Sequence, residues 1–233
     1  MAAEHNSMPR AMSLAVHELR TPVTVVAGYL RMLLREQGGP ISDKQRKMLE
    51  EAERSCGRLG ALVAEMSDLG KLESGDVKLA EQSFDFAELL AELASRMHEG
   101  SDRGVRLELR GADRPIEVVG DRSRLGAALA ALLHASLRER GEPGVVVAEC
   151  STTAGSSPDV LVAIGDENTV RELATGTDQA PFDEWRGGQG LALPVARRVV
   201  EAHGGRVWSA TGDRPRAGSA LRIPLKANQV SQT

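Results

Sequence analysis

Aromatic residues are scarce in this sequence: Phe, Trp and Tyr together make up 3% of its 233 residues. Leucine, valine and alanine must therefore fill the interior, since apolar residues still account for 41% of the chain. That length suits one large domain or two small ones. No apolar run approaches the length of a membrane span, and no basic start followed by an apolar block predicts a signal peptide.

Cysteine and net positive charge are also in short supply. The two cysteines, Cys56 and Cys150, lie far apart, and we interpret them as buried small apolar residues in a reducing compartment. The formal net charge is −4 at pH 7, so there is no strongly basic field to bind nucleic acid. We expect a cytoplasmic protein, or the cytoplasmic piece of a larger one, with no membrane segment and no nucleic-acid partner.

The first region, residues 7–75, has a helical rhythm with one break at Gly38-Gly39-Pro40. Apolar residues recur every three or four positions on both sides of the break, which predicts two helices with one apolar seam each. Ser42 and Gln45 have the spacing of a capping box and predict the start of the second helix. The seam residues are Leu19, Val23, Val26, Leu30, Leu33, Leu49, Ala52, Cys56, Leu59, Val63 and Met66.

A single helical hairpin would leave half of this apolar seam in water. Two copies that pair as a four-helix bundle would bury it, and symmetric pairing is the usual form of a homo-oligomer. A monomer whose second domain covers the seam is the alternative. We expect a homodimer, with residues 1–77 as the dimerising hairpin.

The second region, residues 78–233, alternates between strand and helix patterns, which is typical of an α/β sandwich. The whole chain is therefore expected to be α+β: an antiparallel helical hairpin followed by a sandwich. The polar stretch between Asp166 and Gly190 has weak periodicity and is interpreted as a lid or a disordered connection. Strands are predicted at 105–109, 116–119, 145–150, 160–164, 207–210 and 220–224, and helices at 84–97, 121–140 and 190–203.

The segment SLAVHELRTP, residues 13–22, is the most informative in the chain. His17 precedes the seam residue Leu19 by two positions and should face solvent, on the same helix face as Thr21. The carboxylate of Glu18 can hold one imidazole nitrogen protonated while the other attacks. Pro22 removes a backbone donor and predicts a local kink. Alternatively, Thr21 caps a helix that starts at Pro22, and His17 is an ordinary surface residue.

These residues resemble the phosphoacceptor box of sensor histidine kinases, and LGKLESG at 69–75 resembles that family's exit from the second helix. The resemblance extends over nearly the whole chain. It implies two-component signal transduction in which His17 accepts the phosphoryl group and Glu18 is its acid/base partner. Thr21 would help to place a water for dephosphorylating a response regulator. The implied partners are a second copy of the chain and a regulator's receiver domain.

Residues 78–233 resemble the family's Bergerat-type ATP-binding domain, for which ATP and Mg²⁺ are the expected cofactors. The best match is the glycine box at residues 187–193, since glycines before a helix let backbone N–H groups approach phosphates. A flexible loop would have the same composition. The resemblance implies nucleotide contacts at Gly188, Gly190 and Leu191. Arg138 stands where a lysine is common and could meet phosphate.

Two other boxes of that domain are altered. Ala131 and Ala135 replace the two asparagines, and a methyl group offers no oxygen to Mg²⁺. Gly165 stands where the family has the adenine-binding aspartate. Asp166 could replace it through a slip of one residue, although such a slip on a strand reverses the side-chain direction. We assign no metal ligand and expect autophosphorylation from ATP to be weak or absent.

Three functions remain open from the sequence. The leading hypothesis is a histidine phosphotransferase that exchanges phosphate between His17 and the aspartate of a receiver domain. The second is an active sensor kinase core whose nucleotide site uses substitute ligands. The third is a module without chemistry that docks on a kinase or regulator.

Overall fold

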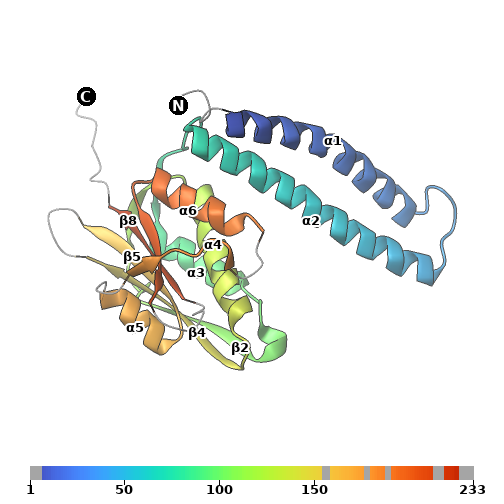
Figure 1. The fold of residues 1–233 in the computed structure, drawn as a ribbon. Coiled ribbons are helices and arrows are strands. Elements are labelled where there is room, and N and C mark those ends of the chain that lie inside the picture. The colour runs from blue at the N-terminus through green and yellow to red at the C-terminus, as the bar shows by residue number, and fades with distance from the viewer. Residues whose placement is uncertain (1–6, 154–157, 176–178, 187–189, 212–217, 226–233) are drawn as a thin grey trace. The chain divides into compact units, whose positions relative to one another are not determined.

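The computed structural model describes residues 7–153, 158–175, 179–186, 190–211 and 218–225. The chain divides into two compact units, Met1–Val77 and Lys78–Thr233. The first is a helical hairpin and the second contains a sheet with helices (Figure 1). Among the described helices, none is both long and apolar enough to span a bilayer.

The hairpin consists of α1 (Ser7–Leu34) and α2 (Asp43–Ser74). The predicted capping box is confirmed: the Gln45 N–H donates to Ser42 Oγ at 3.3 Å, and the Ser42 N–H donates to Gln45 Oε1 at 2.8 Å. Gly75 ends α2 with φ of 73°, a left-handed conformation that glycine adopts without strain. The Arg46 guanidinium donates to the Leu34 carbonyl, and this contact fixes the connection between the helices.

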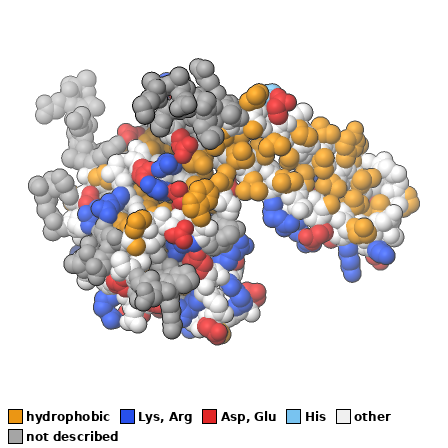
Figure 2. Space-filling model, in the orientation of Figure 1, with side chains coloured by type: hydrophobic (Ala, Val, Ile, Leu, Met, Phe, Trp, Pro, Cys, Tyr) orange, Lys and Arg blue, Asp and Glu red, His pale blue; other side chains and the backbone are white. Residues whose placement is uncertain are grey.

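Helix α1 runs without interruption through Pro22. The alternative in which Thr21 caps a new helix at Pro22 is therefore wrong, because the turns before and after the proline belong to one helix. The seam is only partly buried within one hairpin. Cys56 and Val63 are buried, whereas Val26 and Leu59 remain about half exposed. Apolar side chains gather along the hairpin in Figure 2.

The second unit contains a six-stranded sheet in the order β2-β4-β5-β8-β7-β6 and a separate pair, β1–β3. Among the described strands, only β2 and β4 pair in parallel. The predicted α+β class is confirmed. The elements are β1 (Gln82–Asp85), α3 (Phe86–Arg96), a 3₁₀ turn (Ser101–Arg103), β2 (Val105–Arg110), β3 (Glu117–Gly120), α4 (Arg122–Glu139), β4 (Gly144–Thr152), β5 (Asp159–Gly165), α5 (Glu167–Thr175), β6 (Gln179–Pro181), α6 (Ala192–Ala202), β7 (Arg206–Ala210) and β8 (Ser219–Pro224).

Two sequence expectations for this unit are corrected. The helix predicted at 84–97 begins at Phe86, because Asp85 ends strand β1 and its carboxylate accepts the Ala87 N–H as an N-cap. The stretch between Asp166 and Gly190, expected to be irregular, contains α5 and β6. Helix α5 has only nine residues, so its apolar spacing extends over too few turns to stand out from the polar residues around it.

Helices lie on both faces of the sheet. Helices α3, α4 and α6 lie together on one face, and α5 lies apart from them (Figure 1). Val170 and Leu173 of α5 pack in a buried cluster with Leu161, Ala163 and Trp208 of the sheet. The central strand β5 is buried along nearly its whole length because apolar side chains meet it from both sides.

His203 joins the start of α4 to the end of α6. Its Nε2 accepts the Asp121 N–H at 2.9 Å, and its Nδ1 lies 2.7 Å from the Val199 carbonyl oxygen. The ring must be neutral with the proton on Nδ1 to make both bonds. Gly120 leaves room for this ring, since a Cβ at that position would lie 2.8 Å from His203 Cδ2.

We expect Gly120→Ala to lower the free energy of unfolding by about 1–3 kcal/mol, because the added methyl overpacks the buried imidazole. The matched control is Gly141→Ala, where a Cβ would meet nothing within 4 Å. It should stay within about 0.5 kcal/mol of the wild type. Urea denaturation measures both, and equal stabilities of the two variants would contradict the packing argument.

Candidate functional site

The first candidate site is the exposed face of α1 around His17. Val16 is buried at 5% exposure, whereas the His17 side chain is 80% exposed and the Glu18 side chain 73% exposed. Successive residues of a helix point about 100° apart, so the side chain after the buried Val16 leaves the helix in a different direction. Thr21 is also exposed and follows His17 by one helical turn. The structure thus places all three residues on one open surface.

The imidazole of His17 is oriented by its neighbour. Its Nδ1 lies 3.5 Å from Glu18 Oε1. Nε2 has no hydrogen-bond partner within the part of the chain that the structure describes. A carboxylate beside Nδ1 favours the tautomer with its proton there, which leaves the Nε2 lone pair available as a nucleophile.

The second candidate site lies in the second unit, where the resemblance suggested nucleotide contacts. Ala135 is fully buried and Ala131 is half-buried on α4, and neither side chain carries an oxygen. Arg138 is exposed, and its Nε lies 3.6 Å from Glu99 Oε1. His134 lies 3.7 Å from the same carboxylate. Both side chains of α4 thus lie beside the same acidic residue, Glu99.

Asp166 caps a helix. Its Oδ1 accepts the Thr169 N–H at 2.8 Å, at the start of α5. Partial burial alone would raise the pKa of this carboxyl, but the hydrogen bonds from Thr169 and Asn168 outweigh it, and its pKa lies below the ordinary value. A Cβ at Gly165 would lie 2.8 Å from Thr169 Cγ2. A buried threonine methyl therefore fills the space beside Gly165.

A buried ion pair joins α4 to the segment before the glycine box. Arg186 Nη1 lies 3.0 Å from Glu139 Oε2, and the arginine side chain is only 8% exposed. Its guanidinium also lies 5.8 Å from the centre of the Phe182 ring. Burial lowers the pKa of Arg186 and raises that of Glu139, and each charge counteracts the shift of the other. No sequence pattern predicts this pair, because both residues resemble ordinary surface charges.

The glycine box is only partly visible. Gly188 lies outside the described residues. Gly190 has φ of 63°, a left-handed conformation that favours glycine. Leu191 occupies the N-cap position of α6 and makes no side-chain cap hydrogen bond. The start of this helix thus has the glycine-to-helix order that the sequence predicted.

Residues 10–75 match the model of the His Kinase A (phospho-acceptor) domain. The chain is 30% identical over 212 residues to the hybrid signal transduction protein dokA of Dictyostelium discoideum, covering 85% of this chain and 12% of that protein. It is 27% identical to the sensor protein DivL of Caulobacter vibrioides, covering 91% and 27%. It is 30% identical to the signal transduction histidine-protein kinase BarA of Escherichia coli, covering 82% and 22%. The chain thus spans about a quarter or less of these relatives.

Solved structures share the fold. Full-length ShkA in complex with AMPPNP superimposes with a TM-score of 0.68 at 22% identity, covering 93% of this chain and 45% of that one. Histidine kinase ThkA in complex with response regulator protein TrrA gives a TM-score of 0.53 at 20% identity, covering 93% and 61%.

We expect Asp166→Ala to lower the free energy of unfolding by about 1 kcal/mol at neutral pH, because α5 loses its cap. Folding lowers the pKa of Asp166. The charged carboxylate therefore stabilises the fold fully at pH values above its unfolded-state pKa of about 3.9. This stabilisation is lost as the pH falls through the lower pKa of the folded state. The difference between wild type and Asp166→Ala in urea denaturation should therefore shrink below about pH 4.

The control is Asp166→Asn, whose amide can cap the helix but does not titrate. The difference between the Asn and Ala variants should stay constant across the same pH range. A difference between wild type and Asp166→Ala that grows on acidification would show that the carboxylate does not act as a charged cap.

Proposed function

Since this chain belongs to the sensor histidine kinase family, we propose that its His17 exchanges a phosphoryl group with the aspartate of a response regulator's receiver domain. Autophosphorylation from ATP is weak or absent in this proposal. The observation that carries it is the open face of α1, where an 80% exposed imidazole lies beside the Glu18 carboxylate. A receiver domain can approach such a side chain from solvent.

The proposed reaction needs only groups on this face and on the partner. Nε2 of His17 attacks the phosphorus of the aspartyl phosphate, so that a P–N bond forms while the P–O bond to the aspartate breaks. The aspartate leaves as a carboxylate. The proton on Nδ1 stays on the ring and is stabilised by Glu18, because the phosphorylated imidazole gains positive character during attack. The reverse transfer uses the same groups.

The residues of the second unit favour exchange of a phosphoryl group with a regulator rather than phosphoryl transfer from ATP. Phosphoryl transfer from ATP needs a metal ion to neutralise phosphate charge. The methyl groups of Ala131 and Ala135 do not fit Mg²⁺, which requires oxygen ligands. No carboxylate stands at Gly165, the space beside it holds Thr169, and Asp166 caps α5. We therefore derive no step that uses ATP or Mg²⁺.

The chain should acquire label from phosphorylated receiver domains and not from ATP. We expect ³²P to appear on the wild-type chain after incubation with receiver domains of the same organism that carry aspartyl ³²P-phosphate. His17→Gln should lower this label by at least about a hundredfold, because the amide lacks a comparable nucleophile. His98→Gln, which alters an exposed histidine of the second unit, should keep it. Acid-labile, base-stable label on the chain measures the transfer.

A parallel incubation with γ-³²P-ATP and Mg²⁺ tests the second half of the proposal. Strong labelling of His17 in this arm would show that the chain is an active kinase core with substitute ligands. Stable binding of a receiver without label on His17 in either arm would support the docking module and refute phosphotransfer.

We also propose that the hairpin pairs with a second copy of itself. The hairpin carries an apolar groove of about 380 Å³ lined by side chains of both helices, including Val23, Val26, Cys56 and Leu59. Most of its lining residues belong to the heptad seam, and the large apolar side chains Val26 and Leu59 are about half exposed. A second hairpin offers the same seam in the opposite direction, so that each copy can bury the other.

Val26→Glu should shift the chain from dimer to monomer, because pairing would bury an uncompensated carboxylate. We expect the dimer dissociation constant to rise at least about a hundredfold. The matched control is Val25→Glu, which changes a neighbour that is equally exposed, at 51%, but does not line the groove. Light scattering after size-exclusion chromatography measures the mass, and a monomeric wild type or a monomeric Val25→Glu variant would contradict the pairing.

A further inference from the structure

The edge strand β2 is shorter than its neighbour β4, which leaves a notch at the edge of the sheet. The parallel pairing of β2 with β4 ends at Arg110 and Glu149, whereas β4 continues to Thr152 and pairs there only with β5. The chain turns away at Gly111, which has φ of 70°. A Cβ at Gly111 would lie 2.0 Å from the Cys150 carbonyl oxygen, so the connection can approach the strand this closely only with glycine.

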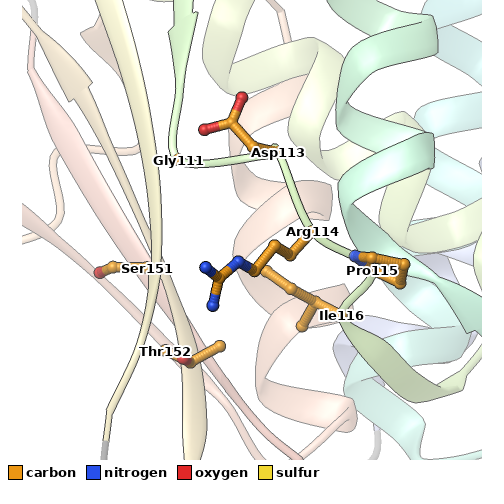
Figure 3. Close-up of a pocket in the computed structure, with 7 residues that line it drawn as sticks. All are labelled: Gly111, Asp113, Arg114, Pro115, Ile116, Ser151 and Thr152. Carbon is orange, nitrogen blue, oxygen red and sulfur yellow. The ribbon is translucent and has the colours of Figure 1, made fainter.

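The connection from Gly111 to Ile116 and the end of β4 enclose a pocket of about 330 Å³ in this notch. Figure 3 shows the Arg114 side chain reaching across it toward β4. Thr152 extends toward the same space, whereas Ser151 points to the other side of the strand. Pro115 and the buried side chain of Ile116 provide apolar wall. The volume is at the lower end for ligand pockets and suits a compact molecule.

Arg114 supplies the positive charge among the described residues that line this pocket. Among the described residues, Arg114 has no ion pair or hydrogen-bond partner, whereas Arg110 at the end of β2 pairs with Glu108 and Glu167. The Asp113 carboxylate also lines the pocket but points away from the guanidinium (Figure 3). The Arg114 guanidinium is thus not neutralised from within the site.

We propose that this pocket binds a small organic carboxylate. A guanidinium holds a carboxylate through two parallel hydrogen bonds, and one arginine suffices to balance its single charge. The apolar wall at Pro115 and Ile116 matches a short hydrocarbon body. A phosphate dianion would need further cations or a cluster of backbone donors, and no second arginine or lysine of the described ranges lines the pocket. The site is separate from His17 and does not depend on the phosphotransfer proposed above.

The test is a titration of the full ¹⁵N-labelled chain with butyrate, followed at the amides of Gly111, Arg114 and Thr152. We expect saturable shifts at these amides. Arg114→Gln should weaken binding at least about tenfold, because it removes the charged fork of donors. Thr152→Glu should abolish binding through repulsion. Both side chains are exposed, so the variants are expected to fold.

The matched control is Arg106→Gln, which removes the same charge from an exposed arginine of β2 that does not line the pocket. It should bind butyrate like the wild type. Absence of saturable shifts in the wild type, or equal weakening by Arg106→Gln and Arg114→Gln, would overturn the site. Inorganic phosphate that binds these amides as tightly as butyrate would overturn the assignment to carboxylates.

Discussion

Two successive residues of α1 lie in opposite environments, one buried and one exposed to solvent. Val16 is buried, and the next residue, His17, is exposed to solvent beside Glu18. The 100° step between successive helical residues imposes this contrast, so the exposure of the imidazole follows from the burial of its neighbour. The proposed phosphoryl chemistry depends on this geometry.

Charged residues of the second unit stabilise its own fold. Asp166 caps α5. Glu139 at the end of α4 pairs with the buried Arg186, which precedes the glycine box. Removing one member of the Glu139–Arg186 pair would leave an uncompensated buried charge. These residues are therefore more readily kept as structural elements than changed into nucleotide ligands.

The sequence predicted the features that depend on local pattern. The capping box at Ser42 and the long helices α1, α2 and α4 follow from signals within a few turns. The short helix α5 was missed because nine residues give too few repeats. The pair between Glu139 and Arg186 could not be foreseen, since 47 residues separate its members. The resemblance to the ATP-binding domain suggests Asp166 as a displaced adenine ligand, although an aspartate directly before Glu167 also has the local pattern of a helix cap.

His203 constrains two positions of the chain jointly. Its imidazole accepts the Asp121 N–H, reaches the Val199 carbonyl and occupies the space that a side chain at position 120 would need. Only a flat ring with one donor and one acceptor fills this role. During evolutionary drift, a smaller residue at 203 would release the restriction at 120, whereas a change at 120 alone would push the ring away from both partners. Positions 120 and 203 should therefore change together in diverging lineages. Glycine should remain at position 120 wherever histidine remains at position 203.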